Sequence, residues 1–158
     1  MLTEEQKKRV SDLVNYLVSL AKRDDRAALA ELRRLRQPGG PRFTALRHII
    51  GFLPEDEVGM DSFILVAGLF ATHPEQAGGR TLGAAVKSIE DRSGSMDRRF
   101  HSLLDADRAV MQMLLPRIIS ILKAKGIGVD YRNLLETVLD WDDPERPRRL
   151  RWARDFVK

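Results

Sequence analysis

The sequence predicts an all-α protein, a compact helical bundle of two packed helical halves. Three observations support this fold class: 32% of the 158 residues are charged and only 6% aromatic, apolar residues recur at helical spacing, and no segment has a convincing strand pattern. A hydrophobic content of 43% is sufficient for a core. We expect a single domain, residues 1–158, with halves 1–92 and 97–158 joined by a short hinge at 93–96.

The first half contains five predicted helices, because apolar residues recur there every three or four positions between cap and breaker residues. Their approximate ranges are 3–22, 25–35, 43–53, 61–70 and 82–89. A Pro–Gly run at 37–41 and a loop at 73–79 separate them. The nearly continuous apolar stretch from Ser62 to Phe70 indicates a buried helix, the expected core of this half.

The second half contains four predicted helices by the same criteria, at about 97–104, 110–122, 134–139 and 143–156. We expect Pro116 to kink or divide the second of them, because proline removes a backbone donor. Gly126 should cap its end, and Asp130 and Asp143 should begin the two helices that follow. Trp141 and Trp152 are expected in the core.

The composition excludes several classes of site. There is no cysteine, which excludes disulfides and thiolate metal sites and is compatible with a reducing cytoplasm. Three widely separated histidines do not predict a metal site, and no nucleotide-binding or hydrolase motif is present, so we expect no metal, no cofactor and no catalytic residue. The amphipathic N-terminal segment is neither a signal peptide nor a membrane span, so a cytoplasmic location is expected.

The basic residues are unevenly distributed. The whole net charge of +4 lies in residues 80–158, which hold 16 basic and 12 acidic side chains. Arginine, whose planar guanidinium suits phosphate contacts, dominates the clusters at 33–36, 98–99 and 146–154. In the last cluster, helical geometry places Arg148, Arg151 and Arg154 outward, whereas Arg149 falls within the apolar arc. These clusters predict a polyanionic partner.

Several stretches also agree in order and spacing with a known family. They are ALAELRR at 28–34, TLGAA at 81–85, DRRFHSLLDADR at 97–108, YRNLLETVLDW at 131–141 and WARDF at 152–156. With these stretches the chain resembles the CasB family, the small subunit of the type I-E CRISPR Cascade surveillance complex. The resemblance covers nearly the whole chain and depends on the ordered set, since no single motif is diagnostic.

The resemblance implies an all-helical, non-catalytic protein of antiviral defence. Its implied partners are the other Cascade subunits, including the backbone subunits and a second copy of itself, the CRISPR RNA, and the target and displaced DNA strands. Basic side chains would stabilise the guide–target hybrid and the displaced strand. The candidate nucleic-acid-binding residues in the resembling stretches are Arg33, Arg34, Arg98, Arg99 and Arg108. Charge and helical geometry add Arg117, Arg148 and Arg151.

Two other functions remain open from the sequence. Arg42 and His48 have the Arg-x5-His spacing of helical HEPN ribonucleases, although chance alone supplies about one such pair in a chain of this composition. A helical DNA-binding regulator of another kind is the second alternative. It should show a recognition helix with outward polar side chains after a short turn, and no segment has that pattern clearly.

Overall fold

The computed structural model describes all residues, 1–158, and confirms the predicted all-α fold. The only strand-like feature is one isolated β-bridge. The helices are α1 (Glu4–Lys22), α2 (Arg26–Arg33), η1 (Arg34–Arg36), α3 (Phe43–Leu46), η2 (Ile50–Phe52), α4 (Glu57–Thr72), α5 (Leu82–Lys87), α6 (Gly94–Asp105), α7 (Arg108–Lys125), α8 (Tyr131–Leu139) and α9 (Pro147–Val157). None of them combines the length and hydropathy that a membrane crossing requires.

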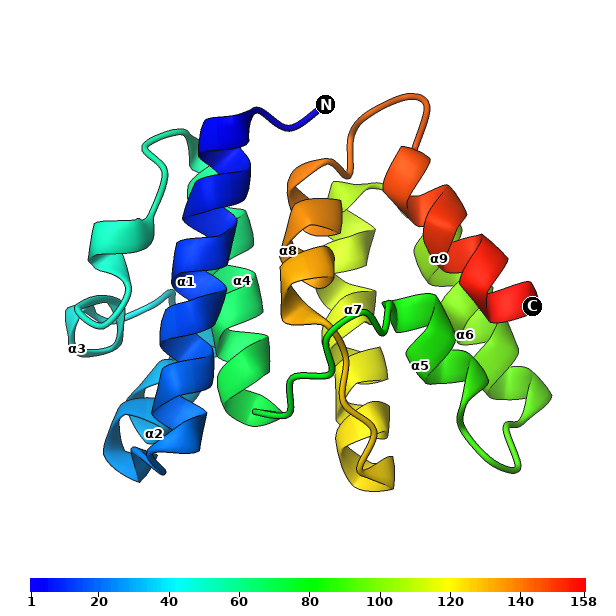
Figure 1. Ribbon diagram of the computed structural model, residues 1–158, viewed down its shortest axis with the longest axis horizontal. Coiled ribbons are helices and arrows are strands. Elements are labelled where there is room, and N and C mark those ends of the chain that lie inside the picture. The colour runs from blue at the N-terminus through cyan, green and yellow to red at the C-terminus, as the bar shows by residue number, and fades with distance from the viewer.

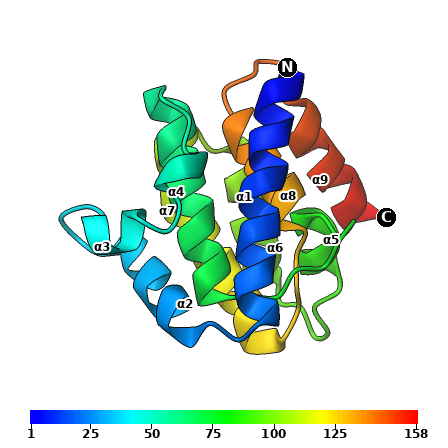
Figure 2. The ribbon, with the colours of Figure 1, turned by 60° about the vertical axis from the view of Figure 1, so that its left-hand side comes forward.

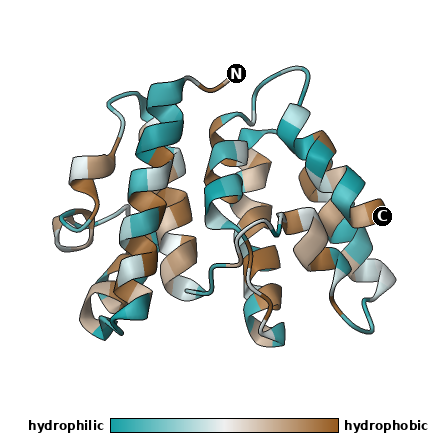
Figure 3. Ribbon diagram, in the orientation of Figure 1, coloured by the Kyte–Doolittle hydropathy of each residue, from teal (hydrophilic) through white to brown (hydrophobic).

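The helices form two groups that share one core. Helices α1 to α4 lie on one side of the molecule and α5 to α9 on the other, and α8 packs against both α1 and α4 between them (Figure 1). A single cluster of 38 buried apolar residues runs through both groups. The surface helix α1 carries hydrophilic and hydrophobic residues along its whole length, whereas α4 is largely hydrophobic (Figure 3). The central position of α8 therefore joins the two groups.

Side-chain caps define where most helices begin. At α1, Thr3 and Gln6 form a reciprocal capping box, with hydrogen bonds of 3.1 and 2.7 Å. The side chains that accept a hydrogen bond from the first turn of the other long helices are Asp25, Asp56, Ser93, Asp107 and Asp130. Two helices were expected to begin at Asp61 and Asp97. Both begin earlier, and these residues lie inside α4 and α6.

The division between the two groups differs from the predicted one. Ser93 caps α6 and residues 94–96 form its first turn, so the segment 93–96, expected as a hinge, is the start of α6. Helix α5, expected in the first half, packs against α9. This packing is possible because Gly83 has no side chain where α5 meets the backbone of Trp152. The chain passes from one group to the other within residues 73–81.

Two local expectations about helices were also wrong, and a third was wrong in part. The helix expected at 43–53 is divided into α3 and η2, because apolar spacing reports burial and not backbone hydrogen bonding. Pro116 does not divide α7, which continues through it while its neighbours Leu115 and Ile118 are buried. The last helix begins at Pro147, a favourable first position for proline, and not at Asp143.

The loop that joins the two groups is tied to the loop before α8. Gln76 and Val129 form the parallel bridge, and the amide nitrogen of Ala77 donates to the Val129 carbonyl at 3.0 Å. The Tyr131 hydroxyl donates to the His73 carbonyl, and burial raises the pKa of this phenol well above its ordinary value. These bonds fix the positions of α4, α5 and α8 relative to one another.

Candidate nucleic-acid interface

The eight predicted arginines divide into those that are committed within the fold and those that are free. Arg34, Arg98, Arg99 and Arg117 are exposed, and none of them has a hydrogen bond or an ion pair with another side chain. A free, exposed guanidinium retains its donors for a ligand. The structure therefore keeps these four as candidate nucleic-acid-binding residues.

Two of the free arginines line the same surface cleft. Arg99 of α6 and Arg117 of α7 line a small surface cleft, with Leu114 and Ile118 as its apolar walls. No acidic side chain lines this cleft. Two like charges that share a cleft repel each other unless an anion lies between them. This pair is therefore suited to a phosphate group, and Arg98 lies next to Arg99 on the same helix.

A second basic surface lies at the end of α2. Arg33, Arg34 and Arg36 line an open groove in which the other residues are Ala30 and Gln37. Arg33 donates to the Ala71 carbonyl at 3.3 Å, which positions its guanidinium at the end of α4. Burial lowers the pKa of Arg36, whose methylenes cover Gly68. Arg36 was not among the predicted residues, although its place beside Arg34 in the sequence could have indicated it.

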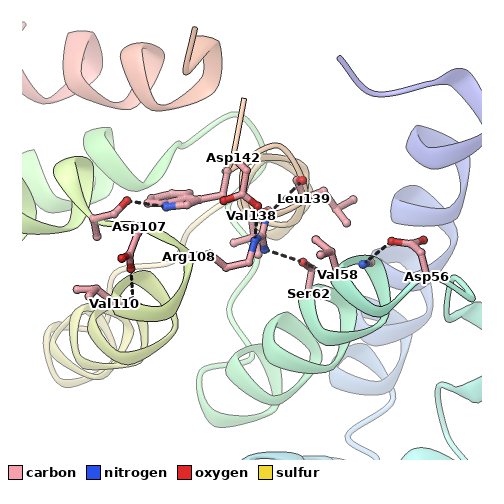
Figure 4. A network of polar contacts seen from close by, with 12 residues as sticks. Asp56, Val58, Ser62, Asp107, Arg108, Val110, Val138, Leu139 and Asp142 are labelled. Carbon is pink, nitrogen blue, oxygen red and sulfur yellow. Dashed lines mark hydrogen bonds and ion pairs between the residues drawn. The ribbon is translucent and has the colours of Figure 1, made fainter. Parts of the chain in front are cut away.

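Arg108 was predicted to bind nucleic acid and is instead committed within the fold. Its guanidinium bonds to the Asp142 carboxylate at 2.7 Å, to the Val138 carbonyl at 2.9 Å and to the Ser62 hydroxyl at 3.3 Å (Figure 4). Only 17% of the side chain is exposed. The sequence did not indicate these bonds, because the partners come from α4 and the end of α8, both remote from Arg108 in sequence. Asp107, the residue before Arg108, caps α7.

The C-terminal cluster is also largely neutralised. Arg148, predicted to point outward, lies between Asp140 at 3.3 Å and Glu136 at 3.6 Å. Arg151 is exposed but forms an ion pair with Asp155 at 3.2 Å. Arg154, on the same helix, is exposed and has no acidic partner. Among the outward arginines of α9, Arg154 is therefore the best candidate for an external anion.

Arg149 and the two tryptophans form part of the core. The Arg149 guanidinium donates to the carbonyls of Leu104 and Ala106, both at 3.0 Å, and lies over the Trp141 ring at 4.2 Å from its centre. Trp141 and Trp152 are 1% and 0% exposed, which confirms that they are core residues. Neither indole is available to stack on a base.

The comparisons with known proteins identify the family. A sequence model of the family described as CRISPR-associated protein Cse2 matches residues 28–156. The chain belongs to the Cse2 family. A relative named CRISPR-associated protein Cse2, from Thermus thermophilus, is 33% identical over 135 residues, which are 82% of this chain and 78% of the relative. The resemblance found in the sequence is thereby confirmed.

Solved structures agree with this Cse2-family assignment. A Cse2-family protein from Thermus thermophilus superposes with a TM-score of 0.82 and 30% identity, covering 94% of this chain and 97% of the other. CasB from M. ruber gives 0.79 and 30%, covering 94% and 92%. A chain of a CRISPR RNA-guided surveillance complex has the same fold, with a TM-score of 0.79, 22% identity and coverage of 96% and 93%.

The Arg–His pair that suggested a ribonuclease is not assembled in this Cse2-family chain. His48 Nε2 lies 3.4 Å from the Glu31 carboxylate, and its side chain is 16% exposed. Arg42 precedes α3, is exposed, and has no hydrogen bond to His48. No three His, Asp or Glu side chains come together as a metal site. Asp107 caps α7, and Asp142 pairs with Arg108.

Proposed function

We propose that this chain is a non-catalytic, nucleic-acid-binding subunit of a CRISPR RNA-guided antiviral surveillance complex in the cytoplasm. Its basic surface would stabilise the guide–target hybrid and the displaced DNA strand. The proposed partners are the other Cascade subunits, including the backbone subunits and a second copy of this chain, the CRISPR RNA, and the target and displaced strands. Membership of the Cse2 family and the shared fold with a chain of such a complex support this proposal.

The observation that carries the proposal is the acid-free cleft between Arg99 and Arg117. Guanidinium groups at such a place bind phosphates, and phosphate contacts carry no direct sequence information. In an RNA-guided complex the sequence is read by base pairing, so the protein needs only contacts of this kind. The chain offers them on α6, on α7 and in the groove at the end of α2.

The arrangement of polar side chains supports a non-catalytic role. A nuclease active site needs a base, an acid or metal ligands within reach of one phosphate. In this chain His48 is engaged by Glu31, and the arginines of the α6–α7 cleft have no histidine or carboxylate among the lining residues. Purified protein incubated with RNA should leave it intact. Cleavage that is lost in the His48→Ala variant would support the ribonuclease alternative instead.

The proposal is tested by the salt dependence of single-stranded DNA binding. Each phosphate neutralised on a single strand contributes a slope of about −0.7 in log K against log salt, so about four contacts should give a slope of about −3. Arg99→Ala and Arg117→Ala should each flatten the slope by up to about 0.7 and weaken all sequences alike. Fluorescence anisotropy with labelled oligonucleotides measures both quantities.

The matched control is Arg26→Ala. Arg26 is also exposed but already paired with Asp24 at 3.2 Å, so its loss should change the slope little. In complexes reconstituted with guide RNA, the Arg99 and Arg117 variants should hold DNA less tightly while the guide selects the same sequence. Unchanged affinity and slope for both variants, with normal DNA retention by the complex, would show that this surface faces solvent and does not bind DNA.

A further inference from the structure

Phe43 is an aromatic residue that the fold leaves in solvent. It opens the short helix α3 and is 68% exposed, whereas Ala45 in the same helix and Ile49 after it are 1% and 0% exposed. The nearby aromatic residues of α1 and η2, Tyr16 and Phe52, pack on each other. A single exposed apolar side chain is ordinary in itself. The packing of the backbone beneath the ring and the charged residues near it therefore indicate whether Phe43 binds a ligand.

The backbone beneath Phe43 is held in place. Helix α3 packs against α2 and η1 (Figure 2). Arg47 at the end of α3 lies 3.3 Å from the Glu31 carboxylate of α2, and His48 lies 3.4 Å from the same group. Burial acts to raise the pKa of Glu31, but the hydrogen bond and charge of Arg47 outweigh it and keep the pKa below its ordinary value. Glu31 therefore stays ionised and anchors α3.

The chain that precedes Phe43 is strongly basic, and α3 packs against η1, which carries Arg34 and Arg36. Between Leu32 and Phe43 the chain carries four arginines and no acid; they are Arg33, Arg34, Arg36 and Arg42. Of these, Arg34, Arg36 and Arg42 have no partner within the chain, and Arg42 is adjacent to Phe43. The acid that precedes this run of arginines, Glu31, already lies within 3.4 Å of Arg47 and His48. An aromatic ring among free guanidiniums is the combination by which proteins bind single-stranded nucleic acid without reading its sequence.

We infer that Phe43 is a stacking platform for an unpaired base of single-stranded DNA, whose phosphates lie along Arg34, Arg36 and Arg42. The inference deepens the proposed function, since the displaced strand is the single-stranded DNA of that function. A protein partner would need a wider apolar surface than Phe43 and its exposed neighbour Ile50 provide, and it would have to supply acids for three guanidiniums. A base pair in a duplex cannot stack on the ring, so the occupant is single-stranded.

The test compares a thymidine oligonucleotide with an abasic oligonucleotide of equal length and charge. Wild-type protein should bind the thymidine strand about tenfold more tightly, which corresponds to one base stacked on an aromatic side chain. Phe43→Ala and Phe43→Leu should lose this preference and bind the abasic strand as the wild type does, whereas Phe43→Tyr should keep it. Because Phe43 is exposed, none of these changes should shift the unfolding midpoint noticeably, and denaturation of each variant checks this.

Fluorescence gives a second, direct measurement. The two natural tryptophans are 1% and 0% exposed, so Phe43→Trp introduces a single exposed indole. Its emission should be quenched by the thymidine strand and not by the abasic strand. Equal quenching by both strands, or a preference for bases that survives Phe43→Ala, would overturn the stacking platform. Normal DNA binding by Phe43→Ala with a loss of assembly with other subunits would assign Phe43 to a protein contact and also overturn it.

The outcomes for this inference and for the proposed function are distinct. If Phe43→Ala keeps the preference for bases while Arg99→Ala and Arg117→Ala flatten the salt slope, the platform is wrong and the proposed function stands. If the preference for bases depends on Phe43 while the salt slope is unchanged in both arginine variants, the phosphate contacts at the α6–α7 cleft are wrong and the platform stands. If wild-type protein binds neither strand at low salt, both are wrong.

Discussion

Arg108 and Asp142 connect the start of α7 to the segment after α8. The Arg108 Nε atom donates to Asp142 Oδ2 at 2.7 Å, and the same guanidinium reaches the Val138 carbonyl in the last turn of α8 at 2.9 Å. The last carbonyls of a helix have no partner within it, and Arg108 gives that of Val138 a charged donor in addition to the Trp141 amide at 3.3 Å. Its contact with Ser62 on α4 extends this link across the two groups of helices.

Removal of Arg108 should therefore reduce stability. We expect Arg108→Ala to lower the free energy of unfolding by about 2 kcal/mol, because the Val138 carbonyl and the Ser62 hydroxyl lose a charged donor. Urea denaturation followed by circular dichroism measures the change. Arg117→Ala, on the same helix but exposed and unpaired, should stay within about 0.5 kcal/mol of the wild type. Equal stability of both variants would contradict this role for Arg108.

The difference between Arg108 and Arg117 also shows what the sequence could predict. Composition and apolar periodicity predicted the all-α fold, most helices and the burial of both tryptophans, because these follow from local spacing. They could not separate Arg108 from Arg117, because the partners of the Arg108 guanidinium are distant in sequence. Asp142 is 34 positions from Arg108, and Ser62 is 46. Only the tertiary structure brings them together.

Phe43 was missed for a related reason. The apolar spacing of residues 43–53 predicted one helix with a buried face, and the structure divides this segment into α3 and η2 and leaves Phe43 and Ile50 exposed. Spacing cannot show which apolar residues lack a neighbouring element to cover them. The one sequence signal was the arginine run that ends at Arg42 immediately before the ring.

Helices α5 and α9 approach so closely that Gly83 cannot carry a side chain. A Cβ at this position would lie 1.9 Å from the carbonyl oxygen of Trp152. Gly83→Ala should therefore force the helices apart and lower the free energy of unfolding by about 3 kcal/mol or more. In Gly94→Ala, also in a helix, the nearest atom is the flexible Arg98 Nη1 at 3.5 Å. That control should be neutral or about 0.5 kcal/mol more stable. Thermal or chemical unfolding of both variants gives the comparison, and similar values would contradict the close packing.

Asp155 should make stability depend on acidic pH. Burial acts to raise its pKa, but the Thr81 hydroxyl at 2.6 Å and the charges of Arg151 and Lys158 hold the pKa below its ordinary value. A carboxyl whose pKa is lower in the folded state stabilises the fold above its unfolded pKa, about 3.9, and this stabilisation is lost as the pH falls through the folded value. Asp155→Asn should therefore be less stable than the wild type at neutral pH, and the gap should narrow below about pH 4. A stability difference between the two proteins that stays the same from neutral to acidic pH would show that ionisation of Asp155 does not stabilise the fold.

Arg148 and Arg154 lie on the same helix and should have opposite roles. Arg148 neutralises Glu136 and Asp140, whose side chains are only 13% and 9% exposed, so Arg148→Ala leaves Glu136 without a cation and Asp140 with only the N-terminal ammonium at 3.8 Å. We expect that variant to lose about 1 to 2 kcal/mol of stability and to keep its salt slope for single-stranded DNA.

Arg154 has no acid to satisfy, so Arg154→Ala should leave stability within about 0.5 kcal/mol of the wild type. If the free arginines of α9 contribute to the nucleic-acid surface, the same variant should flatten the salt slope by up to about 0.7, because one phosphate contact is lost. Denaturation and anisotropy on the same preparations measure both properties for both variants. A slope that depends on Arg148 and not on Arg154 would mean that DNA displaces the ion pairs with α8, and would contradict the division between committed and free arginines on which the interface is built.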